Sequence, residues 1–108
     1  MAWRYFAPPV ADRTQRPFVE ELPELLRQRQ LSLRQLARDV GVTDPHLSRL
    51  LRGIGYRTRP SKDLARRVAL ALGLEPDYFL EYREAIVVEA VRTRAGLREE
   101  LYDRLTKR

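Results

Sequence analysis

The 108-residue sequence contains no cysteine and a single histidine. Without cysteine the chain can form neither a disulfide bond nor a thiolate zinc site, and one histidine cannot hold a metal ion alone. The N-terminus lacks the continuous apolar stretch of a signal peptide, and no apolar run approaches the roughly 20 residues that span a bilayer. These absences predict a cytoplasmic protein that uses no metal or other cofactor and does not enter a membrane.

Acidic residues are missing from one stretch of the chain. No aspartate or glutamate lies between Asp44 and Asp63, although the whole sequence has 15 acidic residues against 21 lysine and arginine residues. The basic residues of this stretch are Arg49, Arg52, Arg57, Arg59 and Lys62. From residue 61 onward, by contrast, ten basic residues are balanced by nine acidic ones. A local positive field favours a polyanionic partner, and the alternative is a solvated, arginine-rich surface.

The spacing of apolar residues and helix caps predicts an all-α fold with five helices and an additional C-terminal helix. The predicted helices span residues 18–30, 33–40, 44–52, 62–72, 76–92 and 97–106. Ser32 and Gln35 form a capping box, and Thr43 and Ser61 are the N-caps of the third and fourth helices. Gly96 is expected to mark the bend before the last helix.

Two segments leave a choice open. A proline inside a helix costs about 3 kcal/mol, so the first helix either begins near Pro23 or is kinked in its first turn. The run Ile-Val-Val at residues 86–88 is β-branched and could form a short strand, but its helical flanks favour a continuing helix. The residues expected to contact the core from this region are Tyr78, Phe79, Tyr82, Ile86 and Val91.

Residues 33–52 have the pattern of two helices joined by a tight turn. Gly41 supplies the positive φ that such a turn requires, and Ala37 is small enough for the helices to cross closely. The apolar residues expected where the two helices meet are Leu36, Val40, Val42, Leu47 and Leu50. One such residue would be weak evidence, because any pair of packed helices contains some of them. All of them together, with correct caps, predict a helix-turn-helix.

At these positions the sequence resembles the phage repressor and Cro type of helix-turn-helix protein, also called the xenobiotic response element family. The residues that carry the resemblance are Leu33-Arg-Gln-Leu-Ala37, Gly41-Val-Thr43, Leu47-Ser-Arg-Leu50 and Arg52-Gly53. The segments similar to the family's fourth helix and the start of its fifth are Leu64–Gly73 and Pro76–Phe79. The resemblance implies a compact five-helix domain that binds double-stranded DNA, usually as a homodimer on a palindrome.

The resemblance and the chain length together suggest three regions. We expect an N-terminal arm over residues 1–16, a helix-turn-helix DNA-binding domain over 17–80 and a C-terminal helical extension over 81–108. The arm residues Trp3, Arg4 and Tyr5 could reach a DNA groove, but the two aromatic ones are expected to pack against the domain instead. The extension carries an apolar stripe formed by Leu97, Leu101, Tyr102 and Leu105. This stripe could cover its own core, form a dimer seam or bind a protein partner.

The resemblance also assigns DNA contacts to the third helix and its surroundings. The residues expected in the core are Leu47, Leu50 and Leu51, and those that match base-facing sites of the family are Asp44, Pro45, Ser48 and Arg49. Arg49 could pair with guanine O6 and N7. Asp44 could accept from cytosine N4, or it could only complement the positive end of the helix dipole. The expected phosphate contacts are Thr43, Arg52, Arg57, Arg59 and Ser61.

Nothing in the sequence suggests an enzyme. Ser48 lacks an oriented base, because His46 is only two residues away on a helix and faces a different direction. The leading interpretation is therefore a sequence-specific transcriptional regulator, most simply a repressor. The alternative is an antitoxin-like interaction protein, which would bind a protein partner through its C-terminal segment and use DNA binding for autoregulation.

Overall fold

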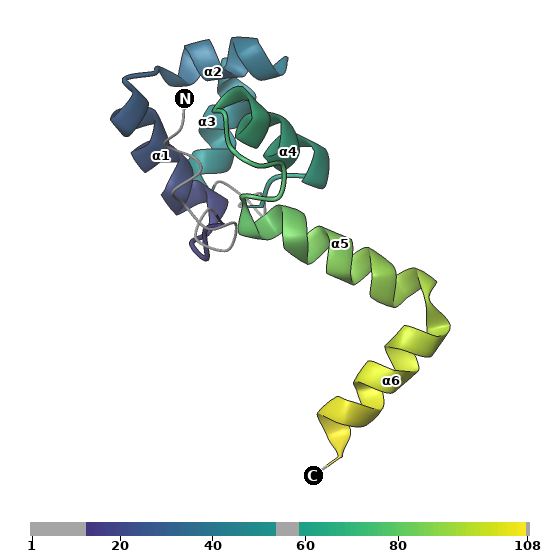
Figure 1. The fold of residues 1–108 in the computed structure, drawn as a ribbon. Coiled ribbons are helices and arrows are strands. Elements are labelled where there is room, and N and C mark those ends of the chain that lie inside the picture. The colour runs from purple at the N-terminus through teal and green to yellow at the C-terminus, as the bar shows by residue number, and fades with distance from the viewer. Residues whose placement is uncertain (1–12, 54–58, 108) are drawn as a thin grey trace.

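The computed structural model of this chain describes residues 13–53 and 59–107, and all of the regular structure in these two ranges is helical (Figure 1). The helices are α1 (Phe18–Arg29), α2 (Leu33–Val40), α3 (Asp44–Arg52), α4 (Lys62–Ala71), α5 (Leu80–Thr93) and α6 (Ala95–Thr106). The predicted all-α fold is confirmed, and α2 and α3 have the predicted bounds. The expectations for Trp3, Arg4, Tyr5 and Arg57 lie outside the described residues.

A single apolar core joins α1–α4 to the turn before α5. Its buried residues are Phe18, Leu22, Leu25, Leu26, Leu36, Ala37, Val40, Leu47, Leu50, Leu64, Ala65, Val68, Ala69, Leu72 and Phe79. The rings of Phe18 and Phe79, far apart in the sequence, meet edge to face with centroids 4.8 Å apart, an arrangement that aromatic pairs prefer. Leu51, expected in the core, is only half-buried, because it lies about 100° around the helix from Leu50.

α1 runs through Pro23 without ending there. The helix begins at Phe18, as the predicted range has it, and Pro23 lies on its exposed side, so the alternative in which α1 begins near Pro23 is wrong. The N-cap residue Pro17 has no side chain that could accept a hydrogen bond, and Glu81 of α5 takes over this role. Its Oε2 accepts from the backbone N–H of Phe18 at 3.0 Å. A carboxylate at this position also complements the positive end of the helix dipole.

α5 begins four residues later than predicted, at Leu80 instead of Pro76. The carbonyl oxygens that would continue the helix backward are already occupied. Arg83 donates to the carbonyls of Asp77 and Tyr78 at 2.8 and 2.9 Å, and the N–H of Thr14 donates to the Tyr78 carbonyl at 3.1 Å. The N-terminal segment and Arg83 thus hold the preceding residues in a turn. Tyr78 is fixed further by donating its hydroxyl to Glu21, and burial together with this hydrogen bond raises the pKa of Tyr78.

The sequence predicted the bend before the last helix at Gly96, but the bend between α5 and α6 lies at Arg94. Arg94 has extended dihedral angles (φ −113°, ψ 97°), and Gly96 lies inside α6. The hydroxyl of Thr93 donates to the Glu89 carbonyl at 2.9 Å, in the turn where α5 ends. Such side-chain bonds compete with the backbone ladder and bend helices, so no residue with glycine's freedom is needed here.

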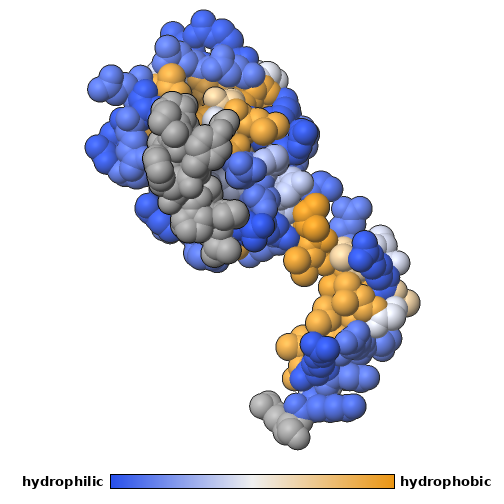
Figure 2. All heavy atoms as spheres, in the orientation of Figure 1, coloured by the Kyte–Doolittle hydropathy of each residue, from blue (hydrophilic) through white to orange (hydrophobic). Residues whose placement is uncertain are grey.

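α5 leaves the domain after its first turns, and α6 continues away from it (Figure 1). The side chains of Ile86, Val87 and Val88 are 44%, 58% and 47% exposed, so the expected core contact of Ile86 is wrong. These residues are helical and form no strand. α6 has no buried residue, and Figure 2 shows apolar surface along both helices. Outside its core, the molecule therefore presents a bent pair of helices, several of whose apolar side chains are exposed.

No helix within the described ranges is long and apolar enough to cross a membrane. Among the same residues, no cluster of three or more His, Asp or Glu side chains could hold a metal ion.

Substitution of Leu47 tests how far the domain depends on the position of α3. Leu47 is 0% exposed, so Leu47→Ala is expected to lower the free energy of unfolding by about 2–5 kcal/mol, out of a total near 5–15 kcal/mol. Leu70→Ala on α4 is the matched control, since Leu70 is 46% exposed, and a loss of about 0.5 kcal/mol or less is expected. Urea denaturation measures both. Equal losses would contradict the buried role of Leu47.

Candidate nucleic-acid interface

The two helices α2 and α3 are each fixed at both ends by local contacts. Ser32 and Gln35 form the predicted capping box at the start of α2, with hydrogen bonds of 2.9 and 3.0 Å. Thr43 caps α3, its Oγ1 accepting from the His46 N–H at 3.1 Å. Between the two helices Gly41 has φ 79°, a left-handed conformation that glycine adopts readily but that costs L-residues free energy.

Arg67 of α4 holds the turn from the other side. Its Nη1 donates to the carbonyl oxygen of Val40, the last residue of α2, and its Nε lies 2.9 Å from the carboxylate of Asp63. A cation at this place complements the negative end of the α2 dipole. A Cβ added at Gly41 would lie 3.5 Å from Arg67 Nη1. The turn is therefore fixed by backbone conformation and by a contact from the fourth helix.

The core decides which face of α3 is available to a ligand. Leu47 and Leu50 are 0% and 5% exposed and pack against the other helices. The exposed residues of α3 are Pro45, His46, Arg49 and Arg52, while Asp44 and Ser48 are half-buried. Neither Arg49 nor Arg52 forms an ion pair with any residue that the structure describes. The solvent face of α3 thus carries two positive charges that no described acidic group neutralises.

A cleft of about 500 Å³ separates α3 from the start of α4. It is lined by His46, Arg49, Leu50, Arg59, Pro60, Ser61 and Leu64. The cleft brings together Arg49, which the sequence assigned to base contact, with Arg59 and Ser61, which it assigned to phosphate contact. Asp44, Pro45, Ser48, Thr43 and Arg52 lie on or beside α3 but do not line this cleft. Two arginines from different segments therefore face the same concave surface.

The hydroxyl groups of Thr43 and Ser61 already act as helix caps. Ser61 Oγ accepts from the Leu64 N–H at 3.1 Å, just as Thr43 Oγ1 accepts at the start of α3. A hydroxyl that accepts a hydrogen bond can still donate its own proton. Each cap therefore retains one donor that can be directed to an anion at the start of its helix.

Asp44 occupies the first turn of α3, directly after the cap Thr43. Its carboxylate lies 3.8 Å from the Nε of Arg34 on α2, and both side chains are largely solvated (42% and 79% exposed). An exposed pair of this kind contributes 0–1 kcal/mol at most. The position favours the second of the two roles considered for Asp44, in which it complements the helix dipole.

The sequence assigned no role at this surface to two residues near the cleft. His46 lines the cleft three residues before Arg49, and the i, i+3 spacing that places both on one face of α3 was the signal available for it. Glu84 is the other residue, since its carboxylate pairs with Arg59. The sequence gives no local signal for this pair, because Glu84 lies on α5 and reaches the loop before α4 only in the folded chain.

The fold and this surface define a helix-turn-helix protein of the DNA-binding class. A family model described as helix-turn-helix matches residues 24–79, which is more than half of the chain. The chain belongs to this family, of the repressor and Cro type, whose members bind DNA sequence-specifically and regulate transcription. Comparison with curated proteins and with solved structures gave no match.

Substitution of Gly41 tests the turn between α2 and α3. Gly41→Ala is expected to lower the free energy of unfolding by about 1–2 kcal/mol, because alanine is strained at a positive φ. Gly96→Ala is the control. Gly96 is helical, and an added Cβ there meets nothing within 4 Å, so the change should be neutral or stabilising by up to about 1 kcal/mol. Thermal unfolding followed by circular dichroism compares the two, and a loss at Gly96 alone would contradict this assignment.

Proposed function

We propose that this regulator is a repressor that reads the major groove of double-stranded DNA with α3. The observation that carries the proposal is the exposed face of α3, where Arg49 projects beside a cleft that also contains Arg59 and Ser61. The buried leucines behind Arg49 hold its backbone in place. An α-helix fits the major groove, and a rigidly held arginine there forms a bidentate pair with guanine O6 and N7.

The remaining base contacts in this proposal come from the first turns of α3. Pro45 is exposed and apolar, which suits contact with a thymine methyl group. Ser48 lies on the same helix face and is short enough to accept more than one base edge. Asp44 is half-buried in the first turn of α3, where its carboxylate complements the helix dipole, so we assign it the smallest contribution to base recognition of the four.

The phosphate contacts position α3 on the duplex. In the proposal they are made by Thr43, Arg52, Arg57, Arg59 and Ser61, and Arg57 belongs to the part of the loop outside the described residues. Thr43 caps α3 and Ser61 caps α4. Each cap offers one phosphate both its own hydroxyl and the backbone N–H groups at the start of its helix. The arginines neutralise charge without selecting a base.

Two kinds of arginine should therefore give different results in DNA binding. Arg49→Ala is expected to lose discrimination at one or two base pairs, worth about 1–3 kcal/mol. Arg59→Ala, and likewise Arg57→Ala, should weaken binding to every duplex and reduce the slope of log affinity against log salt by roughly one. The measurement is affinity across a salt series, for an operator selected from random duplexes and for its single-base variants.

Arg104→Ala is the control for the charge change, because Arg104 is exposed on α6 and pairs with Glu100 at 2.9 Å. It should alter neither base preference nor the salt slope. If Arg49→Ala weakened every duplex equally while Arg59→Ala changed base preference, the two roles would be reversed. If no arginine variant affected any duplex, this surface would not be the DNA-binding surface.

The proposal includes a homodimer formed through α5 and α6. Large apolar residues of these helices that are exposed or half-buried outside the core are here called the elbow surface. They are Leu80, Ile86, Val87, Val88, Val91, Leu97, Leu101, Tyr102 and Leu105. Leu105 is 80% exposed, and a 12-residue helix without a buried residue is marginal by itself in water. Packing against a second copy would cover this surface and place two copies of α3 on one palindromic site.

Light scattering after size exclusion tests the dimer. The protein is expected to elute at about twice its chain mass of 12.7 kDa, and Val87→Glu should shift it to the monomer, because a charge would be buried in the interface. Leu70→Glu is the control. Leu70 is an exposed apolar residue on α4, outside the elbow surface, and this change should leave the dimer intact. Dimers that survive Val87→Glu would exclude α5 from the interface.

The second candidate function uses the same surface differently. In an antitoxin-like protein the elbow surface would bind another protein, and DNA binding would serve autoregulation. The exposed side chains of Tyr102 and Leu105 on α6 favour this candidate as much as a dimer does. A monodisperse monomer in the light-scattering experiment, combined with a toxin-like neighbouring reading frame, would favour it over the homodimer.

A further inference from the structure

Arg59 stands between two concave surfaces of the molecule. On one side it lines the cleft beside α3 that contains Arg49 and Ser61. On the other it lines a second cleft of about 430 Å³ along α5, together with Leu80, Arg83, Glu84, Val87 and Val88. Arg59 thus lines both the cleft of the proposed DNA-binding surface and the cleft in which the elbow surface begins.

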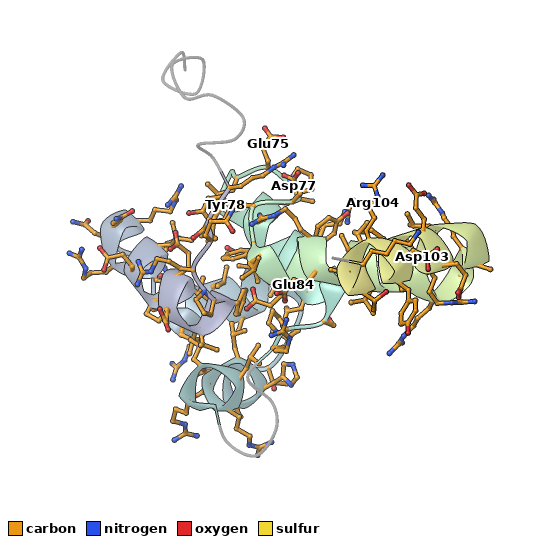
Figure 3. The ribbon with its side chains drawn as sticks, turned by 90° about the horizontal axis from the view of Figure 1, so that it is seen from below. Glu75, Asp77, Tyr78, Glu84, Asp103 and Arg104 are labelled. Carbon is orange, nitrogen blue, oxygen red and sulfur yellow. The ribbon has the colours of Figure 1, made fainter. Side chains whose placement is uncertain are left out.

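The guanidinium of Arg59 is paired with Glu84. Its Nη2 contacts Oε1 of Glu84, and that oxygen is shielded from solvent. The rest of the Arg59 side chain is open, with 63% of its surface exposed. Figure 3 shows Glu84 on the opposite side of the start of α5 from Asp77 and Tyr78. Because Glu84 is also 40% exposed, the pair is largely solvated and contributes little to stability, so another anion can exchange with the carboxylate.

Other charges around Glu84 do not replace Arg59 as its partner. Arg83, the neighbouring base in the second cleft, donates to the backbone carbonyls of Thr14, Asp77 and Tyr78. The next acidic residue along α5, Glu89, lies 3.5 Å from Lys62. Glu84 therefore neutralises the arginine that is also needed to contact phosphate.

We propose that Glu84 competes with DNA phosphate for Arg59 and so limits the sequence-independent affinity of this protein for DNA. A guanidinium that is paired with a carboxylate neutralises a DNA phosphate less completely, because its charge is already balanced. Fewer counterions are then released from the duplex. The pair with Glu84 therefore lowers the affinity for every duplex regardless of its sequence. It does not change the contacts that α3 makes with base edges. The inference rests on the proposed role of Arg59 as a phosphate contact.

The test is Glu84→Gln, which keeps the shape of the side chain and removes its charge. Affinity is measured by fluorescence anisotropy across a salt series, for the selected operator and for an unrelated duplex of the same length. The variant is expected to bind both duplexes about two- to fivefold more tightly at a fixed salt concentration. The slope of log affinity against log salt should become steeper by a fraction of the roughly one unit that a single phosphate contact contributes. Weaker or unchanged binding of both duplexes would overturn the proposal, because Glu84 would then orient Arg59 or have no effect on it.

Glu89→Gln is the matched control. It makes the same charge change on the same helix, but its partner Lys62 does not line the cleft beside α3. If Glu89→Gln increased affinity as much as Glu84→Gln, net charge would explain the effect and the proposal would be wrong. Circular dichroism of both variants checks that α5 is intact.

Arg59→Ala separates the inference from the proposed function on which it depends. In the Arg59→Ala background, Glu84→Gln is expected to have no further effect on either duplex. If Arg59→Ala weakens all duplexes but Glu84→Gln alone does not strengthen them, only the competition is refuted. If Arg59→Ala changes nothing, Arg59 is no phosphate contact, and both the contact and the competition are refuted.

Discussion

The burial of one face of α3 is the constraint on which the rest of this molecule depends. α3 has nine residues, too few for a stable isolated helix in water, so its position is set by the contacts of Leu47 and Leu50 with the core. Once these leucines are buried, the helical period leaves Arg49 in solvent. Gly41 and Arg67 then fix the direction in which α3 leaves α2. The tertiary contacts thereby fix the orientation of the polar side chains of α3, although the helix would not be stable in isolation.

A second set of constraints is polar and lies where α5 begins. Oε2 of the buried Glu81 carboxylate accepts from the N–H of Phe18, although Oε1 has no partner among the described residues. Arg83 donates to carbonyls of the turn before α5 and of Thr14. Buried polar groups without such partners would destabilise the fold. These bonds join the N-terminal segment, α1 and α5, and they set the direction in which α5 leaves the domain. They also place Glu84 opposite Arg59.

The electrostatics of the surface follow from which arginines have acidic partners. Arg49 and Arg52 have none among the described residues, whereas Arg59 is paired with Glu84, so three residues of equal charge are not equally available to an anion. A count of charged residues in the sequence does not distinguish these three arginines. The distinction matters for DNA binding, because the salt-dependent part of the affinity comes from unpaired cations that release counterions from the duplex.

The sequence by itself determined the all-α fold, the bounds of α2 and α3 and the buried face of the helix-turn-helix, because caps, Gly41 and apolar spacing act within a few residues along the chain. Tertiary structure decided the rest. The start of α5, the N-terminal cap of α1 and the partner of Arg59 each depend on a side chain of α5, namely Arg83, Glu81 and Glu84. These side chains act on segments distant in sequence, and a contact between distant segments has no local pattern that could reveal it before the chain folds.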